Sequence, residues 1–415
     1  MKEDPYIALK YPEFRFFLSM RFFLTMAYQV QAVIIGWYVY SITKNPLSLG
    51  FIGLAEALPA IGIALYSGYI ADKFDKVILL RYVMAIMFLA SAALYAITLP
   101  SIANQMHTNQ LIWLIYAIIF IIGLARGFYA PSAFSLMGII IKREHYPNSS
   151  TWNSSIWQFA SITGPALGGL MYGFIGINNS FVIVLVFLAL SFSSVFFIKK
   201  KPPTFVPKDS IVESLSAGLK FVFSNKIIVG ALSLDLFSVF FGGAVALIPV
   251  VAQEILKVGA EQFGFMRAAP AVGAVITMFA MTHFSPMKKP WRNLLFAITG
   301  FALSIICFGL SRNYYLTLFF LFLEGAFDSV SVIIRSTLLQ VLTPDDMRGR
   351  VSAVNSMFIG SSNEIGQFES GLTARLMGTV PAIVFGGCVT LCVVGITWFK
   401  TKAFVGKNLD ELSGE

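Results

Sequence analysis

The sequence predicts an all-helical integral membrane protein with twelve transmembrane helices in two related six-helix halves. The observations behind this fold class are an apolar composition, apolar runs of about 20 residues that recur along the chain, and an internal repeat. Hydrophobic residues make up 57% of the 415 residues and charged residues 12%, and the mean hydropathy is +0.77. Soluble domains carry about 25% charged residues, so the composition leaves no room for a separate soluble domain.

The expected spans are the apolar runs that are long enough to cross about 30 Å of hydrocarbon as helices. They are 14–41, 47–71, 77–99, 110–141, 150–175, 179–199, 226–252, 261–283, 291–311, 313–341, 351–377 and 380–400. The segment before the first span carries acids and a proline and shows no cleavage site, so we expect the first helix to stay as an anchor.

Basic residues are distributed unequally between the loops. With the N-terminus inside, the outer loops contain only Lys44, Lys257 and Arg312, whereas the other loop lysines and arginines fall on the inner side. Short loops keep Lys and Arg in the cytoplasm, so we expect both termini there. The net charge of +9 therefore reflects topology and contact with membrane lipid, and nucleic acid is not an expected partner.

An internal repeat relates the two halves of the chain. Residues 153–169 align with residues 355–371 at an offset of 202, and residues 53–62 align with residues 264–273 at an offset of 211. Glycines, a proline and Asn-Ser pairs recur at matching positions. Two parallel six-helix repeats imply a pseudo-twofold axis along the membrane normal, with a central site between the halves, as in secondary transporters.

The longest polar interruption separates the six-helix halves. It predicts an N-terminal bundle at 1–200, a cytoplasmic linker at 201–225 and a C-terminal bundle at 226–415. Apolar residues recur at helical spacing from Ile211 to Val222, which predicts an amphipathic helix on the inner membrane surface. A plain connector is the alternative.

Two short motifs carry a family resemblance. "GYIADKFDKV" (68–77) resembles the loop signature of the major facilitator superfamily, and "SITGPALGGLMYG" (161–173) resembles the glycine-proline motif of its exporters. The chain departs from the loop signature at Asp75 and Val77. Together with "PDDMRGRVSAVNS" (344–356), the layout resembles the branch that holds bacterial enterobactin exporters and macrolide efflux pumps. The resemblance implies a monomeric multi-pass protein of the bacterial inner membrane.

Two further hypotheses assign roles to these motifs. Gly68, Asp72, Lys73 and Lys76 would form a cytoplasmic latch, in which the carboxylate accepts hydrogen bonds from a helix N-terminus of the other half; a simple positive-inside turn is the alternative. The second motif would bend its helix and help to seal the cavity, as the resemblance implies, or would serve close packing alone. Its residues are Gly164, Pro165, Gly168 and Gly169.

Charges inside the predicted spans are the strongest indication of a functional site, because each is costly in a membrane unless paired or hydrated. They are Arg21, Glu56, Arg126, Asp235, Arg267, Glu324, Asp328, Arg335, Glu364, Glu369 and Arg375. Arg126 and Asp328 are equivalent in the repeat, and we expect them to face each other across the cavity. Asp328 is then the expected proton-coupling carboxylate, and a permanent structural ion pair is the alternative.

The other charges are assigned around this pair. Glu324 lies one turn from Asp328 on the same helix, and Arg335 lies two turns away in the other direction. A second candidate for coupling is Asp235, with Arg21 as its expected partner. We expect an outer gate from Glu56 and Arg375.

Aromatic residues make up 15% of the chain. Several lie where a cavity wall could use them to hold apolar substrates, although a ring that faces lipid leaves the same sequence pattern. These candidate wall residues are Trp37, Tyr38, Phe128, Tyr129, Trp157 and Phe327.

The favoured function is a proton-coupled exporter of an amphipathic small organic molecule, such as a siderophore or a drug. An importer or facilitative carrier would share the fold. The sequence contains no nucleotide-binding motif, metal-ligand cluster or nucleophile motif, so we expect no enzyme activity and no cofactor other than the proton gradient. The arginines favour an anionic substrate and the acids favour a cation, which leaves the substrate open.

Overall fold

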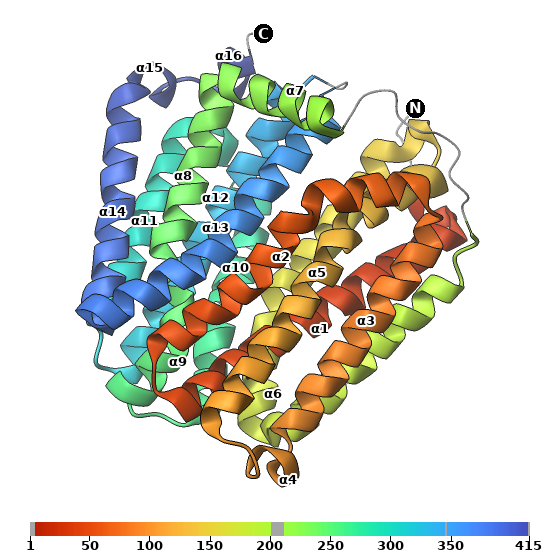
Figure 1. Cartoon of the computed structure of the whole chain (residues 1–415). Helices are drawn as coiled ribbons and strands as arrows, with labels where there is room; N and C mark the ends of the chain where they lie inside the picture. The colour runs from red at the N-terminus through yellow and green to blue at the C-terminus, as the bar shows by residue number, and fades with distance from the viewer. Residues whose placement is uncertain (1–4, 201–210, 285, 345–346, 414–415) are drawn as a thin grey trace. The chain divides into compact units, whose positions relative to one another are not determined.

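The computed structural model describes residues 5–200, 211–284, 286–344 and 347–413, and every regular element in these ranges is helical (Figure 1). Ten helical segments in the described part are long and apolar enough to cross a membrane. The chain divides into two compact units, each described separately below. The first unit contains residues 1–42 and 55–211, and the second contains residues 43–54 and 212–415.

The first unit is built mainly from five long helices. The elements from residue 7 to residue 196 are η1 (Ile7–Lys10), α1 (Pro12–Thr43), α2 (Pro46–Lys73), α3 (Lys76–Thr98), α4 (Pro100–Ala103), α5 (Thr108–Ile140), η2 (Arg143–His145) and α6 (Tyr146–Phe196). The first turns of α2 belong to the second unit. Within α6, Gly176 has φ 74° and ψ 176°, so α6 consists of two helices that meet at this residue. Few residues other than glycine adopt a positive φ at low cost.

After residue 210, the first helix of the second unit packs against the core of that unit. Its elements are α7 (Ile211–Ser224), α8 (Lys226–Gly242), η3 (Ala244–Leu247), α9 (Ile248–Val250), η4 (Val251–Ile255), α10 (Ala260–His283), η5 (Pro286–Lys288), α11 (Pro290–Leu310), α12 (Tyr314–Leu342), α13 (Arg348–Met377), α14 (Thr379–Lys400), α15 (Lys402–Val405) and α16 (Leu409–Ser413). Val222 of α7 is fully buried against Val351 and residues of α8. A helix forms where the sequence predicts one, and its Val222 packs against protein. Its location on the inner membrane surface stays a prediction.

The helices agree with twelve expected spans. The pieces of α6 correspond to the predicted spans 150–175 and 179–199, and the segment from α8 to η4 corresponds to 226–252. The ten apolar segments do not include α13, which carries charges along its length. Counting α6 as two helices and adding α13 accounts for the remaining spans.

Close helix packing in each unit depends on glycines at particular contacts. In the first unit, a methyl group at Gly164 would lie 2.6 Å from the Gln29 Cβ atom, and one at Gly168 would lie 2.9 Å from the Val30 Cα atom. In the second unit, a methyl group at Gly325 would overlap the Pro270 carbonyl oxygen. These residues let α6 approach α1, and α12 approach α10, at backbone distance.

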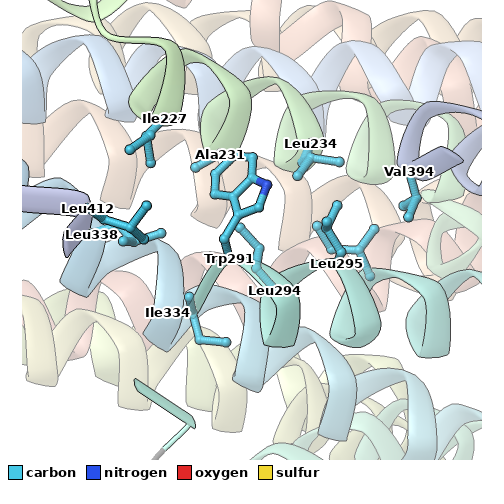
Figure 2. Packing of buried hydrophobic residues seen from close by; sticks show 11 residues of the cluster. Ile227, Ala231, Leu234, Trp291, Leu294, Leu295, Ile334, Leu338, Val394 and Leu412 are labelled. Atoms are coloured by element: carbon cyan, nitrogen blue, oxygen red, sulfur yellow. The ribbon is translucent and has the colours of Figure 1, made fainter. Parts of the chain in front are cut away.

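The core of the second unit is centred on Trp291, which is fully buried (Figure 2). We call this group the Trp291 cluster; its members are Ile227, Ala231, Leu234, Trp291, Leu294, Leu295, Ile298, Ile334, Leu338, Val394 and Leu412. The indole Nε1 donates a hydrogen bond to Thr401 Oγ1 at 2.8 Å. Leu412 comes from α16, so a segment beyond α14 completes the packing of α8, α11 and α12.

Candidate functional site

The second unit contains a buried ion pair between α8 and α12. Asp235 on α8 pairs with Arg335 on α12, and their side chains are 7% and 6% exposed. Lys and Arg are rarely buried this deeply unless they are paired. The pair therefore joins the two helices inside the second unit, away from its surface.

A small cavity lies beside this ion pair. Its volume is about 10 Å³, which is close to the space that one water molecule needs. Asp235 and Asp328 both line it, with Ser238 and Ser331 as further polar groups. The cavity therefore brings carboxylates from α8 and α12 to the same small polar space.

A second charged group lies one turn along α12. Arg267 on α10 interacts electrostatically with Glu324, which in turn is close to Asp328. The Arg267 Nη1 atom donates a hydrogen bond to the Val245 carbonyl oxygen at 3.2 Å. Val245 lies in η3, where the helical path of α8 is interrupted after Gly242. Arg267 therefore satisfies an acceptor in the irregular backbone that follows α8.

The first unit has its own charged contact, between α1, α2 and α5. Arg126 on α5 pairs with Glu56 on α2. It also donates a hydrogen bond to the Tyr28 hydroxyl at 2.9 Å, and its guanidinium lies 4.2 Å from the centre of the Tyr28 ring. The Glu56 side chain is 9% exposed, whereas that of Arg126 is 31% exposed. Because a guanidinium is costly against lipid, the exposed part of Arg126 is expected to face a hydrated space.

A second Arg–Tyr contact joins the same two helices. Arg21 on α1 lies beside Tyr129 on α5, close enough for electrostatic interaction. The two side chains are close enough for a hydrogen bond between them, and among the described residues the Arg21 Nε is a buried donor without a hydrogen-bond partner of its own. Arg21 precedes Tyr28 by two turns, so α1 and α5 present two reciprocal Arg–Tyr contacts on facing sides.

Comparison with known proteins identifies the family. A family model described as "Transmembrane secretion effector" (MFS_3) matches residues 4–414. The chain belongs to this family of the major facilitator superfamily. It is a multi-pass membrane transporter.

Curated relatives support this assignment. The transporter is 23% identical over 394 residues to the enterobactin exporter EntS of Shigella flexneri, covering 93% of this chain and 90% of the relative. The enterobactin exporter EntS of Escherichia coli O1:K1 is also 23% identical, over 93% of this chain and 91% of the relative.

Solved structures share the fold of the transporter. A D-xylose-proton symporter has a TM-score of 0.71 at 14% identity, covering 96% of this chain and 100% of the other. A bacterial homologue of the iron transporter ferroportin, in its inward-facing state, has a TM-score of 0.69 at 14% identity, covering 95% and 99%. These structures and the family consist of transporters, which agrees with a non-enzymatic protein.

Two predicted site residues have partners within their own unit that the sequence did not indicate. Glu56 pairs with Arg126, and Asp235 pairs with Arg335 on α12. The choice of partner depends on the rotation of each helix about its axis, which the positions of charges along the chain do not determine. The expected contacts that join different units stay predictions; they are Glu56 with Arg375, Asp235 with Arg21, and Arg126 with Asp328.

The predicted latch is described only in part. The environments of Gly68 and Asp72 lie outside what the structure describes; Lys73 is exposed and Lys76 is buried. Asp75, which departs from the family signature, is the N-cap of α3, and its Oδ1 atom accepts hydrogen bonds from Val77 N at 2.9 Å and Ile78 N at 3.1 Å. An Asp directly before an apolar helix is a recognised start signal, so the sequence could have revealed this role.

The predicted glycine-proline motif lies within α6. Gly164 and Gly168 contact α1, while Pro165 is inside the helix and Gly169 is buried. The contacts with α1 agree with the packing interpretation. A role in sealing the cavity stays a prediction.

The candidate wall residues have different environments. Trp37 is 7% exposed and its ring lies 6.1 Å from that of Tyr172, so it packs between α1 and α6. The Phe327 ring lies against Gly300 of α11. Trp157 is 36% exposed, whereas Tyr38, Phe128 and Tyr129 are half-buried. Contact of any of these rings with substrate stays a prediction.

Proposed function

We propose that the transporter is a proton-coupled exporter that exchanges protons for an amphipathic small organic molecule by alternating access. The observation that carries the proposal is the charge balance of the interior of α8, α10 and α12. Three carboxylates lie there, those of Asp235, Glu324 and Asp328, against two guanidiniums, those of Arg267 and Arg335. One carboxylate is therefore in excess.

An excess carboxylate in a membrane interior needs a neutralising charge. An unpaired buried charge costs several kcal/mol, and a bound proton removes that cost. Asp235 is paired with Arg335, and Glu324 has Arg267 nearby. Asp328 lines the cavity, which has room for about one water molecule, so a proton has a polar place to enter. These contacts favour Asp328 as the group that binds and releases the proton.

Outward direction is supported by the relatives. The family is described as a secretion effector, and the curated relatives are enterobactin exporters. At 23% identity, the substrate of those relatives is a guide to chemical class only, and fold alone does not identify a substrate. We propose that both termini lie in the cytoplasm, that the proton gradient is the energy source, and that no cofactor takes part.

The test uses inside-out membrane vesicles with an acidic lumen, in which export is measured as uptake. A catecholate siderophore and a lipophilic cationic dye are offered to the wild type and to Asp328→Asn. We expect gradient-dependent uptake of one of them by the wild type, at least tenfold slower in Asp328→Asn. Glu261→Gln is the matched control, because Glu261 is an exposed acid in the first turn of α10.

Each outcome has a direct meaning. Uptake that follows the gradient and is lost in Asp328→Asn, but is kept in Glu261→Gln, supports proton-coupled export. Uptake that ignores the gradient would show a facilitative carrier instead. Full coupling in Asp328→Asn would remove this residue from the mechanism.

A further inference from the structure

The beginning of α11 and the end of α14 meet at one edge of the second unit. The two helices pack side by side (Figure 1). Trp291 at the start of α11 donates its indole hydrogen bond to Thr401, the residue that follows α14. In α15, the Phe404 ring lies 6.2 Å from that of Trp291. These contacts hold the neighbouring residues of α11, α14 and α15 together, and we call this place the α11–α14 junction.

The α11–α14 junction carries exposed basic residues. Arg292 follows Trp291, and Lys400 and Lys402 lie on either side of Thr401. The sequence has no Asp or Glu at 262–323 or at 370–409, so α11, α14 and α15 supply no carboxylate of their own.

The next acid along the chain that the structure describes already has a hydrogen bond. Glu411 on α16 accepts it from the backbone nitrogen of Asn408, at 3.0 Å. Within the described residues, Arg292, Lys400 and Lys402 take part in no ion pair. Their positive charge is therefore available to a ligand.

Exposed aromatic rings lie beside these charges. Phe296 is one turn from Arg292 on the same face of α11 and is 57% exposed, and its ring lies 5.8 Å from that of Trp398. The Lys402 Nζ atom lies 5.0 Å from the centre of the Phe399 ring, which is 72% exposed. Rings and long basic side chains at helix ends mark the level of the lipid headgroups. The junction is thus expected at the membrane–water interface.

The first unit contains a counterpart that has a carboxylate. Arg81 on α3 corresponds to Arg292 at the repeat offset of 211, and its guanidinium lies 4.7 Å from the centre of the Phe196 ring at the end of α6. Here Glu13 of α1 accepts a hydrogen bond from the backbone nitrogen of Lys199 at 3.1 Å. The arginine and the ring recur in both units, whereas the described part of the α11–α14 junction shows no such carboxylate contact.

We propose that the α11–α14 junction binds the phosphate group of an anionic membrane phospholipid. Arg292, Lys400 and Lys402 donate to the phosphate oxygens, and the acyl chains lie along the exposed rings of Phe296 and Phe399. A soluble anion would use the charges alone, whereas a lipid uses both the charges and the rings. Basic pockets between membrane helices bind acidic headgroups in this way. The site is independent of the direction of transport and of its coupling to protons.

The experiment measures lipid binding to the purified full-length chain in detergent by native mass spectrometry, which counts bound lipids. The probes are phosphatidylglycerol and phosphatidylcholine with the same acyl chains, and glycerol 3-phosphate as a headgroup without chains. We expect the first phosphatidylglycerol to bind at least tenfold more tightly than the first phosphatidylcholine. Lys400→Gln/Lys402→Gln should weaken that binding about 25-fold, which is about fivefold for each lysine.

Two further variants separate a site from the overall charge. Lys220→Gln/Lys226→Gln removes two exposed lysines from α7 and α8, with the same change in net charge, and should bind phosphatidylglycerol as the wild type does. Lys400→Arg/Lys402→Arg keeps both charges and should keep most of the affinity. The thermal unfolding midpoint of each variant shows whether it is folded.

Three results would overturn the inference. Phosphatidylglycerol binds no more tightly than phosphatidylcholine; the Lys220→Gln/Lys226→Gln variant loses as much affinity as the Lys400→Gln/Lys402→Gln variant; or glycerol 3-phosphate binds as tightly as phosphatidylglycerol and displaces it. The second result would show a general attraction to net charge, and the third would show a site for soluble phosphates. A preference for phosphatidylglycerol that only Lys400→Gln/Lys402→Gln abolishes supports the lipid site.

Discussion

The buried pair between Asp235 and Arg335 allows a quantitative test of the second unit. Asp235→Asn removes the negative charge and leaves the guanidinium, with its side chain 6% exposed, without a counter-charge. Breaking a buried pair in this way costs about 3–5 kcal/mol. At 1.36 kcal/mol per factor of ten, the folding equilibrium constant falls by roughly 100- to 5,000-fold.

The double variant Asp235→Asn/Arg335→Met is the informative comparison. Replacing a whole buried pair by uncharged groups is often neutral or stabilising, so most of the lost stability should return. The free energy of unfolding is measured by denaturant titration of the purified protein, with Glu261→Gln as the control at an exposed acid. If Asp235→Asn is as stable as the wild type, or the double variant is less stable than either single variant, the argument from buried charge is wrong.

Two packing contacts give further predictions. Gly325→Ala places a methyl group onto the Pro270 carbonyl oxygen and should cost at least about 1–3 kcal/mol of unfolding free energy. By contrast, Gly360→Ala, at a site with no atom within 4 Å, should change it little; equal effects would contradict the close packing of α10 and α12. Leu412→Asp removes α16 from the Trp291 cluster and should lower the free energy of unfolding by about 2 kcal/mol. Leu412→Met should leave the free energy of unfolding nearly unchanged. Protease digestion of the segment after α14 checks the second prediction, since an unchanged digestion rate would mean that α16 does not dock.

Much of the helical layout could be predicted because long apolar runs have few alternatives in a membrane. The expected break near residue 176 coincides with Gly176, and the charged helix α13 was predicted from its length and its repeat. Partners of the charged residues could not be predicted in the same way. Glu56 reaches Arg126 because Gly123 of α5 lies directly against the Glu56 backbone. Such a contact depends on how two helices are rotated and how closely they approach, and no local pattern encodes it.

The excess carboxylate among α8, α10 and α12 shows the same limit. Counting the charges inside these helices identifies Asp235 and Asp328 as candidates, but the count alone makes them equivalent. Only the pairing of Asp235 with Arg335 distinguishes the two aspartates. The distinction therefore arises from tertiary packing between α8 and α12.

The position of Leu412 also has a consequence for biogenesis. Leu412 packs with Trp291, although α12, α13 and α14 are all synthesised between them. Chains are made from the N-terminus, and units can fold as they emerge. The Trp291 cluster is therefore complete only after the segment that follows α14 has left the ribosome. The last packing contact of the second unit thus forms after its last long helix has been made.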